Sequence, residues 1–232
     1  GKYDHKGESV VYGDTDSVYF SAYKTLQKEI NEGLIPWTKD SVLGLYDKIA
    51  EEVNGSFKSF MTRAFHTPST RGEVIAAGRE LVASKGLFIT KKRYAVLYYD
   101  KEGKRADVEG KDGKMKAMGL DLKRSDTPVF VQDFLSDLLY MVLQGKEEKE
   151  VLKKISEFRS EFKARPGWEK GSPKRANNMT KYTAAEEKAG RANMPGHVRA
   201  SMNWNRCREM YGDKYSMPIT DGAKVIVCKL KN

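Results

Sequence analysis

Two aspartates stand one residue apart in the stretch Val10–Phe20, which reads Val-Val-Tyr-Gly-Asp-Thr-Asp-Ser-Val-Tyr-Phe. The β-branched and aromatic residues on both sides favour extended backbone, and Gly13-Asp14 between them is typical of a turn. The stretch therefore predicts a β-hairpin with Asp14 and Asp16 at its tip. In extended chain the two carboxylates point to one face, where they repel unless a cation neutralises them. Because Mg²⁺ is bound by such oxygen groups, with substrate phosphates completing the shell, the hairpin predicts a divalent metal site.

Three other interpretations compete with a metal site. Asp-Thr-Asp could form an ordinary polar turn, since aspartate is common in turns for its own local hydrogen bonds. It could open a calcium loop, but Val18 and Tyr19 stand where that loop has an oxygen ligand and a glycine. It could also be the short Asp-x-Asp pattern of a sugar-nucleotide transferase. A bare tripeptide would favour the turn, whereas the two flanking strands favour the metal site.

Basic residues outnumber acidic ones and are unevenly spread. The chain has 42 Lys+Arg and 32 Asp+Glu in 232 residues, which gives a formal net charge of +10. From Pro166 to Asn232 there are 13 Lys+Arg against 6 Asp+Glu. A basic segment beside a segment of mixed charge predicts a polyanionic partner, nucleic acid before membrane.

The sequence carries no sign of a membrane or secreted protein. No apolar run is long enough to cross a bilayer, and the N-terminus lacks the charged-then-apolar pattern of a signal peptide. We therefore expect an intracellular protein without a membrane partner. Cys207 and Cys228 form no C-x-x-C pair and there are three histidines, which argues against a disulfide framework and a zinc site.

The first half of the chain predicts one long helix and several strands. Apolar residues at steps of three and four draw a stripe from about Thr38 to Phe65, which is typical of a helix packed on a sheet. Strand-prone residues follow over 87–99, with Lys91–Tyr94 inside that strand, and again over 114–120. We place a domain boundary at Gly119, because strand patterns give way to helical ones beyond it.

The second half is mainly helical in its pattern, with capping residues at helix starts and glycine or proline after helix ends. It predicts, in order, a helix from Thr127 to Gly145, a helix over 146–163, an irregular stretch over 167–195, a helical stretch from His197 and a strand over 223–230. The basic residues of the irregular stretch suit phosphate contacts and a solvated loop equally.

Two motifs carry a resemblance to a known family. Tyr12-Gly13-Asp14-Thr15-Asp16-Ser17 resembles the palm carboxylate motif of family B DNA polymerases, and Lys91-Lys92-Arg93-Tyr94 resembles the Lys-Lys-Arg-Tyr motif that follows it in that family. The two together are far more specific than either alone. Further matches narrow the resemblance to the replicative polymerases of T-even-like bacteriophages: Glu73 in Arg-Gly-Glu-Val-Ile, Met118-Gly119-Leu120, Ser125-Asp126-Thr127-Pro128 and Ala176-Asn177-Asn178.

The resemblance implies an α+β fold in two parts. Residues 1–119 would form part of a palm domain, with an antiparallel sheet and packed helices. Residues 120–232 would form part of a thumb domain, mainly helical with a small β element. The family's upstream aspartate motif, triphosphate-binding fingers, proofreading exonuclease and clamp-binding tail have no counterpart in this sequence. We therefore expect either a fragment or one half of a split polymerase, inactive by itself and located in the cytoplasm of an infected bacterial cell.

The resemblance also implies a two-metal site. Asp16 would be the principal ligand of two Mg²⁺ ions, together with an aspartate of the upstream motif, and Asp14 and Glu73 would be supporting carboxylates. Asp14 and Asp16 are accordingly the expected catalytic residues. Two such ions activate the primer 3′-hydroxyl and stabilise the departing pyrophosphate, so the protein contributes mainly position and charge.

The implied partners are a primer-template duplex, a dNTP in the complete enzyme, and the missing N-terminal part of the polymerase. Lys92 and Tyr94 match positions that contact the minor groove near the new base pair, where the acceptors are nearly the same for every correct pair. The residues expected to contact DNA are Lys91, Lys92, Arg93, Tyr94, Arg124, Lys174, Arg175, Lys181 and Arg199. The alternative function is a duplex-binding module without catalysis that keeps the hairpin as a scaffold.

Overall fold

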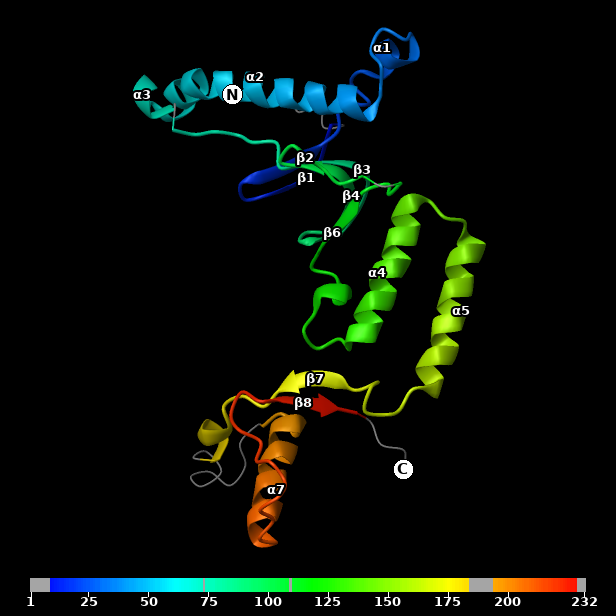
Figure 1. Cartoon of the computed structure of the whole chain (residues 1–232). Coiled ribbons are helices and arrows are strands. Elements are labelled where there is room, and N and C mark those ends of the chain that lie inside the picture. The colour runs from blue at the N-terminus through cyan, green and yellow to red at the C-terminus, as the bar shows by residue number, and fades with distance from the viewer. Residues whose placement is uncertain (1–8, 73, 109, 184–193, 229–232) are drawn as a thin grey trace. The chain divides into compact units, whose positions relative to one another are not determined.

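The computed structural model describes residues 9–72, 74–108, 110–183 and 194–228. It combines antiparallel sheets with helices, which confirms the predicted α+β class (Figure 1). The chain divides into two compact units. The first takes the chain up to Gly119 together with Leu143–Gly145, and the second takes Leu120–Val142 and the chain from Lys146 onward.

The predicted hairpin is present, but its turn lies later than expected. Strand β1 (Val10–Asp14) pairs antiparallel with β2 (Ser17–Phe20), and Gly13 lies within the ladder opposite Val18. The turn falls on Thr15 and Asp16, with Thr15 at φ 55°. The prediction that Gly13-Asp14 makes the turn is therefore wrong, and so is the extended backbone assumed between the aspartates. The pairing of Tyr12 with Tyr19 sets this register, because it puts both rings on one face.

The main sheet of the first unit is built around β4, which pairs with three other strands. Its strands are β3 (Leu81–Thr90), β4 (Arg93–Lys101), β5 (Lys104–Arg105) and β6 (Lys114–Met118). Along β4, Ala95, Val96 and Leu97 are almost fully buried. Lys91 and Lys92 form the turn between β3 and β4, so the prediction of one continuous strand over 87–99 is wrong. Alternating apolar residues on both sides of the turn made two strands resemble one.

One long helix, α2 (Lys39–Phe65), packs on this sheet as predicted (Figure 1). The Thr38 hydroxyl accepts from the backbone N–H of Ser41, and the Ser41 hydroxyl accepts from the N–H of Thr38, which forms a capping box. Val42 of α2 is buried against Val82 and Tyr99. Two short helices that the sequence did not predict flank it: α1 (Gln27–Asn31) and α3 (Ser69–Gly72).

The second unit begins with the 3-10 turn η1 (Asp121–Lys123) and a pair of helices, α4 (Val129–Gln144) and α5 (Glu148–Ala164). Both helices agree with the predicted ranges, and α4 ends before Gly145 at φ 76°. Phenylalanine rings pack between the two helices, and the rings of Phe134 and Phe158 stack with their centroids 3.7 Å apart. The apolar stripes read from the sequence are therefore packing faces.

The rest of the second unit contains a small sheet and a helix. Strand β7 (Ser172–Arg175) pairs antiparallel with β8 (Lys224–Val227), and α7 (Gly196–Met210) packs Val198 and Met202 against Ala176 and Met179. Strand β7 and a helical turn over 179–183 lie in the stretch predicted to be irregular, so that prediction is wrong where the structure describes it. Strand β7 is stabilised by its pairing with β8. Its four residues do not alternate between apolar and polar side chains, so their pattern gave no indication of a strand.

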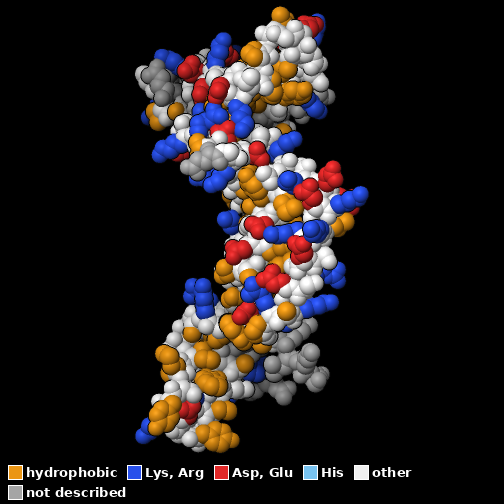
Figure 2. Space-filling model, turned by 45° about the vertical axis from the view of Figure 1, so that its right-hand side comes forward, with side chains coloured by type: hydrophobic (Ala, Val, Ile, Leu, Met, Phe, Trp, Pro, Cys, Tyr) orange, Lys and Arg blue, Asp and Glu red, His pale blue; other side chains and the backbone are white. Residues whose placement is uncertain are grey.

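Apolar side chains remain exposed on the second unit, and Figure 2 shows hydrophobic groups gathered there at the lower end of the view. Tyr211, Tyr215 and Met217, which follow α7, are 79%, 99% and 83% exposed.

In the part of the chain that the structure describes, no helix is long and apolar enough to cross a membrane.

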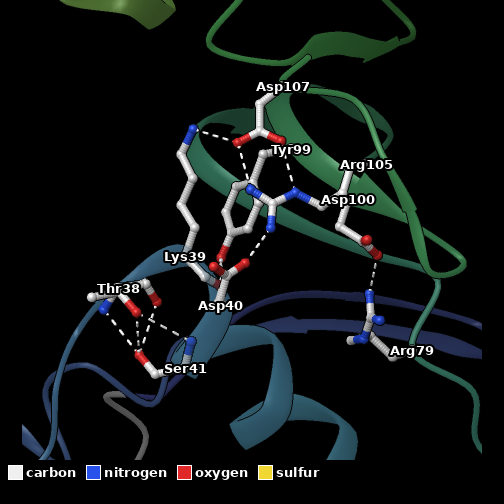
Figure 3. Close-up of polar contacts among 9 residues, drawn as sticks. All are labelled: Thr38, Lys39, Asp40, Ser41, Arg79, Tyr99, Asp100, Arg105 and Asp107. Atoms are coloured by element: carbon white, nitrogen blue, oxygen red, sulfur yellow. Dashed lines mark hydrogen bonds and ion pairs between the residues drawn. The ribbon is translucent and has the colours of Figure 1, made fainter.

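Ion pairs fasten α2 to the main sheet (Figure 3). Asp107, whose side chain is 6% exposed, accepts from Lys39 Nζ at 2.7 Å and from Arg105 Nε and Nη2, both at 2.8 Å. Arg105 also pairs with Asp40 of α2. These contacts with Arg105 and then Lys39 hold the pKa of Asp107 well below its usual range.

We predict that Asp107→Asn lowers the free energy of unfolding at neutral pH by about 1–3 kcal/mol, as expected for hydrogen bonds to charged groups. A carboxylate whose pKa is lowered by folding stabilises the protein above its unfolded-state pKa of about 3.9 and loses this contribution as the pH falls through the folded-state value. The difference between variant and parent should therefore shrink below about pH 4. Urea unfolding at neutral and acidic pH measures it.

Glu52→Gln is the control, because it removes an exposed carboxylate of the same helix that has no ion pair with another described residue. We expect little change in its stability at either pH. An equal loss in the control, or a difference for Asp107→Asn that stays constant into acid, would contradict the assignment.

Candidate metal centre and nucleic-acid interface

The carboxylate of Asp14 is held by three neighbouring groups at the end of β1. It accepts from Tyr12 Oη at 3.4 Å and from Thr15 Oγ1 at 3.2 Å, and Lys92 Nζ lies 3.9 Å from Oδ2. Its side chain is 24% exposed. The oxygens of Asp14 are therefore oriented by the protein while still open to solvent.

Asp16 lies in the turn itself and is exposed. Glu73, the third carboxylate that the resemblance implies, lies outside the described residues. Within the described ranges no group of three or more His, Cys, Asp or Glu is placed to hold a metal ion. The donor set that is present still fits Mg²⁺, because this ion is commonly bound through one or two carboxylates with phosphate oxygens and water completing the shell.

An aromatic cluster joins the hairpin to the main sheet. It is made by Tyr12 and Tyr19 of the hairpin with Phe88 of β3 and Tyr94 of β4, and the ring centroids lie 5.3–6.2 Å apart. The hydroxyl of Tyr19 donates to that of Tyr94 at 3.3 Å. Burial, and then this hydrogen bond, raise the pKa of Tyr19, so its hydroxyl stays protonated at neutral pH. The hairpin is thereby fixed on the sheet by packing.

The turn between β3 and β4 is held from two sides. The backbone N–H of Lys92 donates to Tyr12 Oη at 2.9 Å, and Lys92 has a left-handed φ of 62°. On the other side, Gly119 approaches so closely that a Cβ there would lie 2.0 Å from the carbonyl oxygen of Lys92. Gly119 itself has φ 64°, which favours glycine. The Lys92 side chain therefore leaves a constrained backbone and reaches Asp14.

The other predicted residues of this motif differ in exposure. Lys91 and Arg93 are exposed, and neither has an ion pair with another residue in the described part of the chain. Tyr94 is 5% exposed, with its ring inside the aromatic cluster. The structure thus places three cations at the surface of this turn and the tyrosine beneath them.

In the second unit, basic side chains line a hollow of about 470 Å³. Its lining is mostly polar and comes from the loop after η1, from β7, α7 and β8: Arg124, Ser125, Asp126, Pro173, Lys174, Arg175, Asn177, His197 and Lys224. The predicted contacts Arg124, Lys174 and Arg175 therefore come together. Lys181 and Arg199 are exposed and lie outside this lining.

Several residues of these sites were not singled out from the sequence as site residues, among them Tyr12, Gly119, Lys224 and His197. Tyr12 lies in the carboxylate motif and Gly119 in Met-Gly-Leu, so both belong to motifs that were noted in the sequence. Their role became clear only from their contacts with Lys92 in the structure. Lys224 and His197 join the hollow through the pairing of β8 with β7 and the packing of α7. No local pattern could have indicated them.

Comparison with known protein families matches residues 73–190 to DNA polymerase family B, which is half of the chain. The chain therefore belongs to family B of the DNA polymerases. This membership agrees with the two motifs and leaves the sugar-nucleotide transferase interpretation without support.

Individual relatives include polymerases of T-even-like phages. The chain is 32% identical to the DNA-directed DNA polymerase of Escherichia phage RB69, over 97% of this chain and 25% of that protein. It is 28% identical to the DNA-directed DNA polymerase of Enterobacteria phage T4, over 96% of this chain and 24% of that protein. It is also 30% identical to the DNA polymerase alpha catalytic subunit of Sterkiella nova, over 66% of this chain and 8% of that protein. The chain thus spans about a quarter of the length of the phage relatives it matches.

We predict that Gly119→Ala destabilises the first unit by about 2–4 kcal/mol, because the new Cβ must displace the Lys92 carbonyl as well as adopt a left-handed backbone. Gly103→Ala is the matched control: Gly103 has φ 78°, but nothing lies within 4 Å of a Cβ there. It should cost only about 1 kcal/mol, the backbone part of the effect.

Urea unfolding of the two variants separates the steric effect from the backbone strain. Equal destabilisation of both variants would show that a Cβ at position 119 meets no steric barrier from the Lys92 carbonyl.

Proposed function

We propose that this chain supplies palm carboxylates and primer-template contacts to a DNA-directed DNA polymerase. Residues 1–119 act as part of the palm and residues 120–232 as part of the thumb. The observation that carries the proposal is the direct junction of the two family motifs, in which Tyr12 and Asp14 of the hairpin contact Lys92 of the turn. Family membership and the phage relatives support the same function.

The catalytic role falls on the hairpin. Asp16 is the principal ligand for Mg²⁺, with Asp14 and Glu73 as supporting carboxylates. Mg²⁺ held by these carboxylates would supply activation of the primer 3′-hydroxyl and stabilisation of the departing pyrophosphate. Tyr12 and Thr15 orient the Asp14 carboxylate, since both donate to it. The ammonium of Lys92 lies 3.9 Å from this carboxylate, which is beyond hydrogen-bond distance, so Lys92 does not hold it tightly.

Duplex contacts fall on both units. Lys92 reaches the minor groove at the primer end, with Lys91 and Arg93 on neighbouring phosphates and Tyr94 supporting the turn from below. In the second unit, the hollow takes backbone phosphates, and the exposed residues Lys181 and Arg199 add contacts beyond it.

The partners follow from this role. They are a primer-template duplex, a dNTP, and the portion of a polymerase that carries the exonuclease, the upstream palm motif and the fingers. The phage relatives suggest that these meet in the cytoplasm of an infected bacterial cell. A duplex-binding module without catalysis is the alternative, and primer-junction binding and primer extension distinguish the two.

We predict that the chain binds duplex DNA without sequence preference and that its affinity falls steeply with salt, because binding to phosphates releases counterions. Lys181→Ala or Arg124→Ala should weaken binding about equally on all sequences and reduce the salt slope by roughly one unit for each phosphate that is no longer neutralised. Fluorescence anisotropy over a salt series measures both quantities.

Lys92→Ala should behave differently, because a minor-groove contact at the primer end matters most at a primer-template junction and least on blunt duplex. Lys48→Ala, which removes an exposed lysine of α2, is the control of equal charge. If Lys92→Ala leaves the preference for a junction unchanged, the polymerase role of this turn fails and the alternative module gains support.

We predict that these 232 residues alone do not extend a primer, because the family resemblance implies a second metal-binding aspartate and triphosphate-binding residues that this sequence does not carry. A primer-extension assay with purified chain and Mg²⁺ tests this. Incorporation directed by the template, and abolished by Asp16→Ala, would contradict the prediction of inactivity.

A further inference from the structure

One carboxylate stands among the cations of the hollow and contacts two of them. Asp126 Oδ1 accepts from Arg124 Nε at 2.9 Å, and Oδ2 accepts from Arg124 Nη2 at 3.1 Å and from Lys174 Nζ at 2.7 Å. The side chain of Asp126 is 26% exposed. These contacts, Arg124 first and then Lys174, hold the pKa of Asp126 well below its usual range, so it is ionised at neutral pH.

This carboxylate connects two segments that are far apart in the sequence. Arg124 belongs to the loop after η1, whereas Lys174 belongs to β7. The loop itself is anchored, because Gln132 of α4 donates to the carbonyls of Arg124 at 3.0 Å and of Thr127 at 2.8 Å. Asp126 therefore projects from a fixed backbone and sets the position of a cation on each side.

Both cations retain free donors after pairing with Asp126. A guanidinium has five N–H groups, and Asp126 takes one from Nε and one from Nη2 of Arg124, which leaves Nη1 for another acceptor. The ammonium of Lys174 has three N–H groups and gives one to Asp126. Arg175 and Lys224 line the same hollow without a carboxylate partner among the described residues. The hollow therefore keeps an excess of positive charge.

We propose that Asp126 is a positioning residue, which holds the guanidinium of Arg124 and the ammonium of Lys174 at a fixed spacing so that both donate to one phosphodiester of a nucleic-acid strand. The identity of the phosphodiester rests on the proposed function. The placement of the two cations rests on their hydrogen bonds to Asp126. Ordering two long side chains in advance removes part of the entropy that would otherwise be lost when a phosphate binds.

Removing the carboxylate should change the affinity for a polyanion in opposite directions, depending on whether Asp126 only neutralises the cations or positions them. Asp126→Asn removes one negative charge while keeping the size of the side chain. If Asp126 only neutralises, this variant should bind a polyanion more tightly, because the hollow becomes more positive. If Asp126 positions, the variant should bind less tightly in spite of its greater positive charge. The direction of the change decides between the two.

The experiment measures duplex DNA binding by fluorescence anisotropy at several salt concentrations. We expect Asp126→Asn to weaken binding by about threefold to tenfold, as expected when one or two charge-assisted hydrogen bonds are misaligned. Asp137→Asn is the matched control, since Asp137 pairs with Lys154 at 3.2 Å between α4 and α5 and lies outside the hollow. It makes the same change in net charge and should leave binding unchanged or slightly tighter.

A double-mutant cycle with Arg124→Ala separates positioning from a general structural effect. Once Arg124 is absent, Asp126→Asn should cost less than it does in the parent chain, because the two residues act as one unit. Asp126→Glu provides a second test that keeps the net charge and moves the carboxylate by one methylene. Positioning predicts weaker binding for this variant, and neutralisation predicts no change.

Polyphosphate serves as a second probe that does not depend on the proposed function. If the parent chain fails to bind duplex DNA, the proposed function fails, while weaker polyphosphate binding by Asp126→Asn would still support positioning. Thermal unfolding by circular dichroism checks that each variant is folded, and Asp126→Glu replaces Asp126→Asn if the latter is not. Parental or tighter binding of both probes by the folded variants would overturn the inference.

Discussion

The hydrogen bond from the backbone N–H of Lys92 to the hydroxyl of Tyr12, at 2.9 Å, connects the parts of the first unit that matter for function. A two-stranded hairpin is marginally stable in water by itself, so the carboxylates of the β1–β2 hairpin depend on what it packs against. The aromatic cluster provides the apolar contact, and this hydrogen bond sets the position along it. The acidic and basic motifs are consequently packed against each other within the first unit.

Carboxylates fix cations at several places on this basic chain. Asp14 lies beside Lys92, Asp107 holds Arg105 and Lys39, and Asp126 holds Arg124 and Lys174. A chain with a net charge of +10 must place many like charges near one another, which costs free energy. Single carboxylates within the clusters lower this cost and restrict long side chains. Lys92, Arg105 and Arg124 thus each lie beside a carboxylate.

The sequence was sufficient to predict features that depend on local pattern. The apolar stripes of α2, α4 and α5, and the hairpin at Asp14, follow from residue types and spacing alone. The turn at Thr15-Asp16 and the break at Lys91-Lys92 were missed, because packing of the tyrosines and the approach of Gly119 select them. The hollow was predicted only in part, since Lys224 and His197 reach it through contacts between distant segments.

The pairing of β7 with β8 has a consequence for how the protein folds during synthesis. The strands of the main sheet are joined by short connections, so they can pair soon after they leave the ribosome. Strand β8 must instead close a loop over residues 176–223, which costs more chain entropy. Lys224 therefore joins the other cations late, and a nascent chain carries an incomplete hollow until β8 has been made and has paired with β7.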